Sequence, residues 1–452
     1  IMTVSLSINA YAADPVMVKD INPNGSAGVG TVEVFGNYII FNANDGTNGL
    51  EKWITDGTEA GTSMIKNCNP NGDGTKHSFG IEFNNEFYFI GNDGTNGYEL
   101  WKTDGTENGT YMVKNIYRRD ASSYPERFHV YNNSLIFRAT KDRDRDNEPF
   151  KTDGTESGTE QILELQRKSF TLGRGSYITN LTNMGDYFYF HGYSDDTGVE
   201  LWRSNGTENG TVLVKDINPD GHAIYEGYGI ALLNNELFFT ARDDASNAEL
   251  WKSDGTENGT VLVKDINTGG PSYPSQFTKC GNFVFFIADD GAHGKELWKT
   301  DGSETGTVLV KDINSGSAGS NPAWDMNYYY TVLNGELYFM ADDGVHGLEL
   351  WKSDGTEAGT FMIKDINPNG DSKPKRFISI GNKMYFRADD GNGVEIWETD
   401  GSTTGTIKIS DINPSGDANA LPKATLNNVL YFSADDGTHG VELWKYDPNA
   451  VD

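Results

Sequence analysis

The chain has 452 residues, and its 36 Lys and Arg against 66 Asp and Glu give a formal net charge of −30 at pH 7. This balance excludes nucleic acid as an expected partner, because so acidic a surface repels a polyanion. Hydrophobic residues make up only 36% of the chain, whereas Phe, Trp and Tyr together reach 12%. Such a composition favours thin layers packed through aromatic side chains over one large aliphatic core. No apolar run is long enough to cross a bilayer, so we expect no membrane span.

Residues 1–14 differ from the sequence that follows them. The segment IMTVSLSINAYAA contains Ala10-Tyr11-Ala12, which matches the small-residue pattern of a signal-peptide cleavage site, while the basic stretch that should precede it is missing. We therefore expect residues 1–14 to be the remnant of a signal peptide and residues 15–452 to form one domain. The expected location is outside the cell, either secreted or at the cell surface.

One segment, best preserved as ELWKSDGTENGTVLVKDI at residues 249–266, recurs along the chain. Its aromatic residue occurs nine times, 46 to 53 residues apart, at Trp53, Trp101, Phe150, Trp202, Trp251, Trp298, Trp351, Trp397 and Trp444. Self-similarity with such a period indicates an architecture built from repeated supersecondary units.

Each unit holds four short segments separated by turn residues, as in RFISIGN, KMYFRADD, VEIWETD and TIKISDI of the unit that begins at Arg376. Period-two alternation predicts that these segments are strands, and helix signals are absent. The turn between the first two strands is a pair of Gly, Asn or Asp residues, which tolerate the positive φ of a type I′ hairpin. A four-stranded meander that recurs every 40 to 50 residues is typical of a β-propeller blade.

The predicted fold class is therefore all-β: a single β-propeller of about nine four-stranded blades, with an eight-bladed or open arrangement as the alternative. The two ends of the chain favour closure. Residues 16–21, VMVKDI, match a fourth strand without its first three, whereas the last copy ends after its third strand at residues 444–447. Pairing of the N-terminal strand with the last blade would close the ring and remove an exposed sheet edge.

The repeat resembles that of the ELWxxDGT repeat proteins, a family of secreted or surface-associated bacterial proteins, over residues 15–452. The pattern ELW-x-x-DGT-x-x-GT-x-x-VKDI is nearly intact in the copies at Glu99, Glu249, Glu296 and Glu349. The copy at Glu148 departs from it as Glu-Pro-Phe, and the copy at Glu51 as Glu-Lys-Trp. The resemblance implies propeller-like repeats and a role at the cell surface, and it transfers no catalytic residue.

The loops between successive units vary in length and sequence, and variation on a fixed scaffold is where binding sites are found. The candidate ligand-binding aromatic residues in these loops are Tyr124, Tyr177, Tyr225, Tyr228, Tyr273, Trp324 and Tyr328. Exposed aromatic faces would stack on sugar rings or anchor a protein partner. The alternative is that they pack on neighbouring loops or fill the mouth of the central channel.

Arginines concentrate in one region, since eight of the twelve lie between Tyr117 and Tyr177. That window holds 11 basic and 10 acidic residues, a net charge of +1, so the rest of the chain carries −31. The candidates for ligand binding are Arg118, Arg119, Arg167 and Arg174. Their guanidinium groups would bind the carboxylate or sulfate groups of an acidic polysaccharide through paired hydrogen bonds. The alternative is that they pair with the many neighbouring acids on a solvated surface.

Carboxylates at alternate positions, Asp142, Asp144 and Asp146, match the start of a calcium-binding loop and form the candidate metal site. The arginines between them oppose a cation. The Asp-Asp-Gly turns elsewhere fit local backbone capping better than metal binding. The sequence requires no cofactor, and calcium is the one it suggests.

These features predict an exported, non-catalytic binding or adhesion scaffold that recognises carbohydrate or a cell-surface or protein partner through its variable loops. One alternative is a polysaccharide lyase or hydrolase acting on an acidic glycan, with His129, His191 or Tyr177 as the base. The second is a structural surface protein that acts through protein contacts. No residue is assigned as catalytic.

Overall fold

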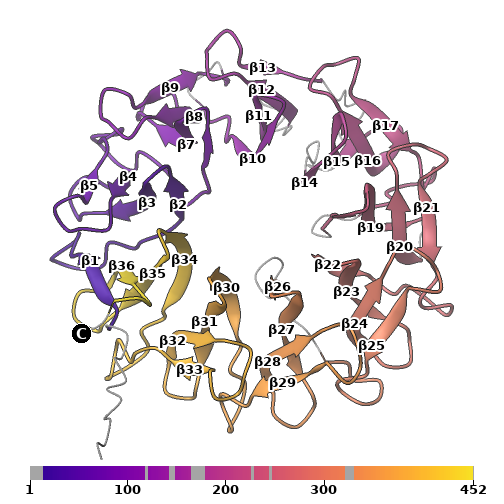
Figure 1. Cartoon of the computed structure of the whole chain (residues 1–452). Coiled ribbons are helices and arrows are strands. Elements are labelled where there is room, and N and C mark those ends of the chain that lie inside the picture. The colour runs from indigo at the N-terminus through magenta and orange to yellow at the C-terminus, as the bar shows by residue number, and fades with distance from the viewer. Residues whose placement is uncertain are drawn as a thin grey trace, which may run out of the picture.

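The computed structural model describes residues 14–117, 121–141, 148–163, 179–224, 229–243, 247–320 and 330–450. These residues form 36 strands in nine four-stranded antiparallel sheets, and no helix occurs among them. The sheets stand around a central opening as the blades of a propeller (Figure 1). The prediction of an all-β propeller with nine blades is therefore confirmed. Residues 1–13, which carry most of the expected signal-peptide remnant, lie outside the described ranges.

We number the blades in chain order, and each blade is given from its first strand to its fourth. Blades 1 to 3 are β2 (Val32–Phe35), β3 (Tyr38–Asn44), β4 (Leu50–Thr55), β5 (Ser63–Met64); β6 (Ile81–Phe83), β7 (Glu86–Asn92), β8 (Tyr98–Thr103), β9 (Tyr111–Lys114); and β10 (Glu126–Tyr131), β11 (Ser134–Ala139), β12 (Glu148–Thr152), β13 (Glu160–Gln161). Blades 4 to 6 are β14 (Thr179–Met184), β15 (Tyr187–Ser194), β16 (Gly198–Ser204), β17 (Val212–Lys215); β18 (Ala231–Leu233), β19 (Glu236–Arg242), β20 (Ala248–Ser253), β21 (Val261–Lys264); and β22 (Ser275–Cys280), β23 (Phe283–Asp289), β24 (Lys295–Thr300), β25 (Val308–Lys311). Blades 7 to 9 are β26 (Tyr330–Leu333), β27 (Glu336–Asp342), β28 (Leu348–Ser353), β29 (Phe361–Lys364); β30 (Lys375–Ile380), β31 (Lys383–Asp389), β32 (Val394–Thr399), β33 (Ile407–Lys408); and β34 (Leu421–Leu426), β35 (Val429–Asp435), β36 (Val441–Tyr446), β1 (Val16–Lys19).

The first strand of each blade contacts the first strands of both neighbouring blades, from β2 and β6 round to β34 and back to β2. These nine innermost strands therefore form the wall of the central channel. The hydrophobic core lies between adjacent blades, as where Phe238 and Leu250 of blade 5 pack with Phe286 and Trp298 of blade 6. Closing the ring buries both faces of every sheet, which a single blade would leave exposed.

The N-terminal strand closes the ring, as the sequence predicts. β1 pairs antiparallel with β36, with Val16 opposite Lys445. The chain after β1 is also held by blade 9, because the carboxylate of Glu442 accepts the backbone N–H of Ile21 at 3.2 Å and that of Ala27 at 3.1 Å. Strands from the two ends of the chain therefore share one sheet, and the edge of β36 is paired.

The hairpin between the first two strands follows the predicted turn chemistry. In blade 2, Asn84 and Asn85 have φ values of 54° and 60°, and in blade 9, Asn427 and Asn428 have φ values of 54° and 63°. A type I′ turn requires positive φ at both central residues. Asn adopts this region more readily than most residues because its short amide bonds to the local backbone.

The Asp-Gly-Thr turn between the third and fourth strands is a scaffold element. In blade 8, which has Ser for Thr, the Oδ1 of Asp400 accepts the backbone N–H of Ser402 at 2.9 Å and its hydroxyl at 2.7 Å. Gly401 has a φ of 89°, and a Cβ there would lie 2.3 Å from the hydroxyl oxygen of Tyr338 in blade 7. Glycine is needed both for the left-handed backbone and for the close approach of the neighbouring blade.

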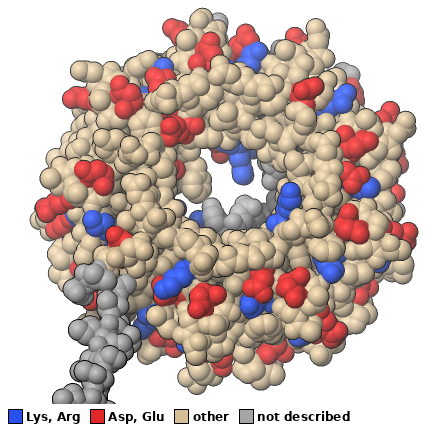
Figure 2. Space-filling model, viewed as in Figure 1, with Lys and Arg blue, Asp and Glu red and all other residues tan. Residues whose placement is uncertain are grey.

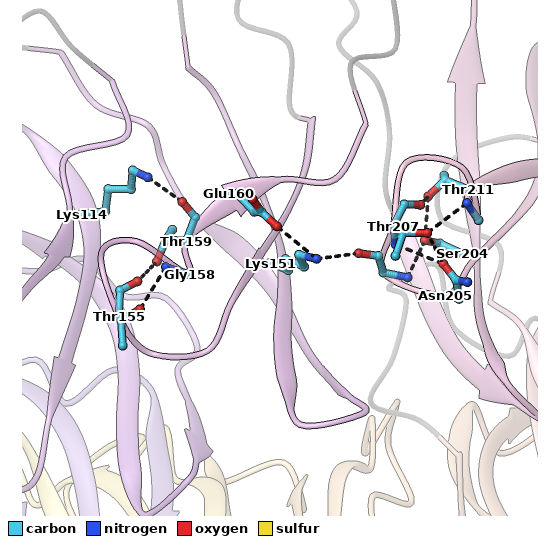
Figure 3. Close-up of polar contacts among 12 residues, drawn as sticks. Lys114, Lys151, Thr155, Gly158, Thr159, Glu160, Ser204, Asn205, Thr207 and Thr211 are labelled. Atoms are coloured by element: carbon cyan, nitrogen blue, oxygen red, sulfur yellow. Dashed lines mark hydrogen bonds and ion pairs between the residues drawn. The ribbon is translucent and has the colours of Figure 1, made fainter.

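A lysine at the end of the fourth strand, or just after it, links most blades to the next one. In blade 2 the Nζ of Lys114 donates to the carbonyl oxygen of Thr159 in blade 3 at 2.5 Å (Figure 3). Equivalent pairs, at 2.7 to 2.9 Å, are Lys19–Thr62, Lys66–Thr110, Lys215–Thr260, Lys264–Thr307, Lys311–Thr360 and Lys364–Thr406. Blade 3 has Leu163 at this position and reaches blade 4 through Lys151, whose Nζ donates to the carbonyl oxygen of Gly206 at 2.9 Å (Figure 3).

Candidate functional site

The channel wall differs in charge from the rest of the molecule. Its nine innermost strands carry five basic residues and three acidic residues, which are Arg127, Lys279, Lys375, Arg376, Lys423, Glu33, Glu82 and Glu126. Five positive and three negative charges give the wall a net +2, in a chain whose net charge is −30. Figure 2 shows Lys and Arg side chains around the central opening, and Asp and Glu side chains mostly on the outer parts of the blades.

The acidic residues of the wall have partners close by. Glu126 forms an ion pair with Arg138 at 2.6 Å, and Glu82 accepts the backbone N–H of Gly36 at 2.9 Å. Glu33 lies against a lysine inside blade 1. Glu126 and Glu33 therefore each have a basic neighbour, and the wall as a whole keeps its net charge of +2.

Blade 1 buries a lysine where the repeat pattern has leucine. Lys52 is 2% exposed, and its Nζ lies 4.0 Å from the carboxylate of Glu33 and 5.3 Å from the ring centroid of Phe87. Burial lowers the pKa of Lys52 and raises the pKa of Glu33. The lysine that replaces leucine in the Glu-Lys-Trp copy is therefore one half of a buried Lys–Glu pair behind the channel wall. Sequence reasoning missed this pair.

Three basic residues of blades 8 and 9 form what we call the basic cluster: Arg376 on β30, Arg387 on β31 and Lys423 on β34. Burial first, and then the positive charge of Arg376, lower the pKa of Lys423 to about 8, while the carboxylate of Glu33 opposes this shift and Arg387 adds a smaller lowering. Arg387 donates from Nη2 to the Oδ1 of Asn419 at 3.1 Å. Like charges held together in a half-buried position raise one another's energy, and an anion bound among them lowers it.

The innermost strands of blades 3, 6 and 8 share an unusual backbone. In each, the pairing with the second strand shifts register at a bulge. The residues within these shifts, Arg127, Gln276 and Arg376, have φ values of 60°, 60° and 63°, in the left-handed region that residues other than Gly rarely adopt. Such conformations cost roughly 1–3 kcal/mol each and are concentrated at functional sites.

The repeated glutamate fixes the loop that leads into each of these strands. The buried carboxylate of Glu349 in blade 7 accepts the hydroxyl of Ser372 at 2.7 Å and its backbone N–H at 3.1 Å. Equivalent pairs in blades 2 and 5 are Glu99–Ser123 and Glu249–Ser272. Burial raises the pKa of Glu349 to about 7, against the opposing effect of these hydrogen bonds. Sequence reasoning missed this role of the glutamate, although a Ser-x-Pro segment follows the interblade loop in all three cases.

Two of the candidate aromatic residues lie in the described part of the chain, and the structure places them in different blades. Tyr124 and Tyr273 precede β10 and β22 and are 43% and 41% exposed. The ring of Tyr124 stacks on that of Tyr98 at a centroid distance of 5.9 Å, and the Nζ of Lys76 lies 4.3 Å from the centroid of Tyr124. Tyr124 therefore packs on neighbouring segments and also keeps part of its surface exposed, and its role in ligand binding stays a prediction.

The other candidate residues lie outside the described residues, and they are Arg118, Arg119, Arg167, Arg174, Tyr177, Tyr225, Tyr228, Trp324, Tyr328, Asp142, Asp144 and Asp146. Among the residues that the structure does describe, no three His, Cys, Asp or Glu side chains are grouped to hold a metal ion. In the same ranges no helix is long and apolar enough to cross a membrane.

Of the two histidines considered as a base for a glycan-cleaving enzyme, one is buried inside a blade and the other contacts the next blade. His191 is 1% exposed, and burial lowers its pKa to about 3, so the ring stays neutral inside blade 4. The Nε2 of His129 in blade 3 lies 2.7 Å from the Oδ1 of Asn183 in blade 4. His191 is thus removed from a substrate in the channel, and His129 links two blades.

No family model and no curated protein matches the chain. Solved structures with a similar fold include a puromycin hydrolase, at 11% identity and a TM-score of 0.45, covering 94% of this chain and 61% of that one. A prolyl endopeptidase matches at 12% identity and a TM-score of 0.44, covering 79% and 54% of the two chains. Prolyl oligopeptidase B from Galerina marginata matches at 11% identity and a TM-score of 0.44, covering 80% and 55%. This chain therefore spans less than two thirds of the length of these proteins.

These structures correct the function expected from the sequence. The prediction of a carbohydrate-binding or adhesive surface scaffold is wrong, because the similar structures are a hydrolase and peptidases. At these identities and TM-scores the similarity assigns no activity to this chain, and the propeller fold rests on the nine sheets themselves. The charge of the channel wall and the basic cluster carry the functional inference instead.

Proposed function

We propose that the central channel binds a ligand with carboxylate or phosphate groups at the basic cluster of Arg376, Arg387 and Lys423. The observation that carries this proposal is the placement of three basic residues on strands that contact one another. Arg376 on β30 and Arg387 on β31 lie on strands of blade 8 that both contact β34 of blade 9, which carries Lys423. An oxyanion among the three offsets their mutual repulsion. Its attraction to them is stronger in this half-buried position than in open water.

The residue types of the cluster suit oxyanions. A guanidinium group is planar and binds two oxygens of a carboxylate or phosphate in parallel, whereas an ammonium group acts as a compact charge that adapts to the bound group. Arg387 is oriented by its hydrogen bond to Asn419, and Arg376 by the bulge at the start of β30. Part of the ordering cost of binding is therefore met by the fold.

The acidic exterior limits which anions reach this site. With a net charge of −30, the outer surface repels large polyanions over distances of about 10 Å at moderate salt. Inside the channel the wall carries a net charge of +2, opposite in sign to that of the whole chain. This contrast favours small or extended anionic ligands.

The proposal needs no cofactor and is independent of the calcium site suggested by Asp142, Asp144 and Asp146. Action outside the cell or at its surface is a further proposal. It is supported by the signal-peptide pattern in residues 1–14 and by the resemblance of the repeats to ELWxxDGT proteins.

The test is fluorescence anisotropy of a labelled oligoglutamate peptide at low ionic strength. We expect Arg376→Gln and Lys423→Gln to weaken binding about tenfold or more, the loss expected for a charged hydrogen bond. The matched control is Lys252→Gln in blade 5, which removes the same charge from a lysine paired with Glu236 at 2.8 Å and should leave affinity unchanged. Competition by inorganic phosphate or by citrate identifies which oxyanion the cluster prefers.

Two results would overturn the proposal. One is the failure of peptide, phosphate and citrate alike to bind the wild-type protein. The other is an equal loss of affinity in Lys252→Gln, which would mean that binding follows overall charge and has no fixed place in the channel.

A further inference from the structure

The bulge that shapes Arg376 is repeated at two other places on the channel wall. Arg127 in blade 3 and Gln276 in blade 6 have the same left-handed backbone at the same position of the innermost strand. Arginine and glutamine have no intrinsic preference for this conformation, so the surrounding structure imposes it. The buried glutamate and the Ser-x-Pro segment before each strand supply that constraint.

Two of these residues stand on nearly opposite sides of the ring. Blade 8 lies five blades from blade 3 in one direction and four in the other, and β10 and β30 flank the opening from opposite sides in Figure 1. Arg127 is exposed. Its strand has a neighbouring blade on each side and its own sheet behind it, so that exposure is to the channel or its mouths. The wall therefore offers basic groups at two separated places.

The residues between and beside the two arginines suit a polypeptide. The side-chain amide of Gln276 can donate and accept a hydrogen bond, as a peptide group does. Tyr124 and Tyr273 lie three residues before Arg127 and Gln276 and keep part of their rings exposed. A compact ion such as phosphate would contact one wall and leave the other residues unused.

We propose that the channel holds an extended acidic peptide with two separate groups of carboxylates, one bound by the basic cluster and the other by Arg127. Gln276 hydrogen-bonds to a peptide group of the stretch between them. This inference rests on the proposed function, because the first group of carboxylates occupies the same cluster. It adds a second binding place and names the ligand class.

The experiment compares two labelled peptides, one with a single group of four glutamates and one with two such groups joined by a Gly-Ser linker of varied length. Simultaneous binding raises the effective concentration of the second group, so the two-group peptide should bind about tenfold tighter or more at the best linker length. Arg127→Gln should remove this advantage and leave the affinity for the one-group peptide unchanged.

Lys279→Gln is the matched control for Arg127→Gln. It removes one positive charge from another exposed residue of an innermost strand, outside a bulge, and should preserve the advantage of the two-group peptide. Gln276→Ala should weaken the two-group peptide only. Thermal unfolding of each variant confirms that the ring is intact.

The outcomes separate the two proposals. If the one-group peptide binds and depends on Lys423, but the second group adds nothing, the anion site stands and the two-place inference fails. If neither peptide binds, both fail. If a linear polyphosphate of equal charge binds as tightly as the two-group peptide and ignores Gln276→Ala, the assignment to a peptide is overturned.

Discussion

The hydroxyl oxygen of Ser372 lies 2.7 Å from the Oε2 of Glu349, a carboxylate buried between a blade and the loop that leaves it. Four residues after Ser372 comes Arg376, whose left-handed backbone belongs to the bulge on the channel wall. The repeated glutamate of blade 7 is therefore connected through one serine to the segment that carries a residue of the basic cluster. Scaffold and candidate site share these contacts.

Ser372→Ala removes the hydroxyl that the buried carboxylate of Glu349 accepts. We expect the free energy of unfolding to fall by about 1–3 kcal/mol, because a buried acceptor loses a partner that water does not replace. Urea denaturation measures the change. Ser379→Ala, at an exposed serine of β30 in blade 8, is the control and should leave stability unchanged. Equal stabilities of the two variants would contradict the role assigned to the Glu349–Ser372 contact.

Gly401→Ala should be strongly destabilising. A Cβ at this position lies 2.3 Å from the hydroxyl oxygen of Tyr338, and the φ of 89° is unfavourable for alanine. Gly381→Ala also has a positive φ, of 58°, but its Cβ would meet nothing within 4 Å. We expect a cost of about 1–2 kcal/mol for Gly381→Ala, from backbone strain alone, and a larger loss for Gly401→Ala. Melting temperatures in the reverse order would show that contact between blades is unimportant there.

Lys264→Met tests the lysines that join neighbouring blades. The Nζ of Lys264 donates to the carbonyl oxygen of Thr307 at 2.8 Å, and methionine keeps the apolar stem without the charge. Loss of a charged hydrogen bond should cost about 1.5–3 kcal/mol in unfolding experiments. Lys279→Met, at an exposed lysine, is the control. An unchanged melting temperature for Lys264→Met would mean that packing alone holds blades 5 and 6 together.

Stability should decline as pH rises from about 5 to about 8. Burial raises the pKa of Glu200 to about 8, and it raises the pKa of the equivalent glutamates to about 7 at Glu51, Glu99, Glu296, Glu349, Glu395 and Glu442. A carboxyl group with a raised folded pKa contributes stability that is fully present below its unfolded value of 4.5 and is lost as pH rises through the folded value. The hydrogen bond to Asp436 raises the pKa of His439, which adds a loss in the same direction.

Differential scanning calorimetry across this range measures the effect. Glu200→Gln removes one of the titrating groups and should flatten the decline. At lower pH the dependence of stability on pH reverses. Hydrogen bonds from Thr356 lower the pKa of Asp354, so the stability that this carboxylate contributes is lost as pH falls below 3.8. A melting temperature that rises between pH 5 and pH 8 would contradict the assignment of raised pKa values to the buried glutamates.

Much of the fold could be predicted because its signals are local. Asn84 and Asn85 indicate a hairpin by their residue type. Residues 16–19 match a fourth strand that has no first three strands before it, which indicates that they complete the last blade. The number of blades follows from counting the repeated aromatic residue, which packs between sheets in every copy. The first of these inferences needs only neighbours in the sequence, and the other two need only the repeat pattern.

The site could not be predicted in the same way. The basic cluster joins Arg376 and Lys423, which belong to successive repeats and come together only when blades 8 and 9 pack against each other. The left-handed φ of Arg376 comes from a bulge in strand pairing, and arginine gives no sign of it in the sequence. Selecting residues by loop composition led to Tyr124, and nothing in the sequence indicates that its ring stacks on that of Tyr98.

The most direct measurement of the central claim is the rate at which Lys423 is acetylated, followed by mass spectrometry with and without the two-group acidic peptide. With a pKa of about 8, the amine of Lys423 should react readily near neutral pH in the free protein. We predict that saturating peptide slows this reaction severalfold and leaves Lys252 unchanged. Equal acetylation of Lys423 in the presence and absence of bound peptide would contradict a ligand site at the basic cluster.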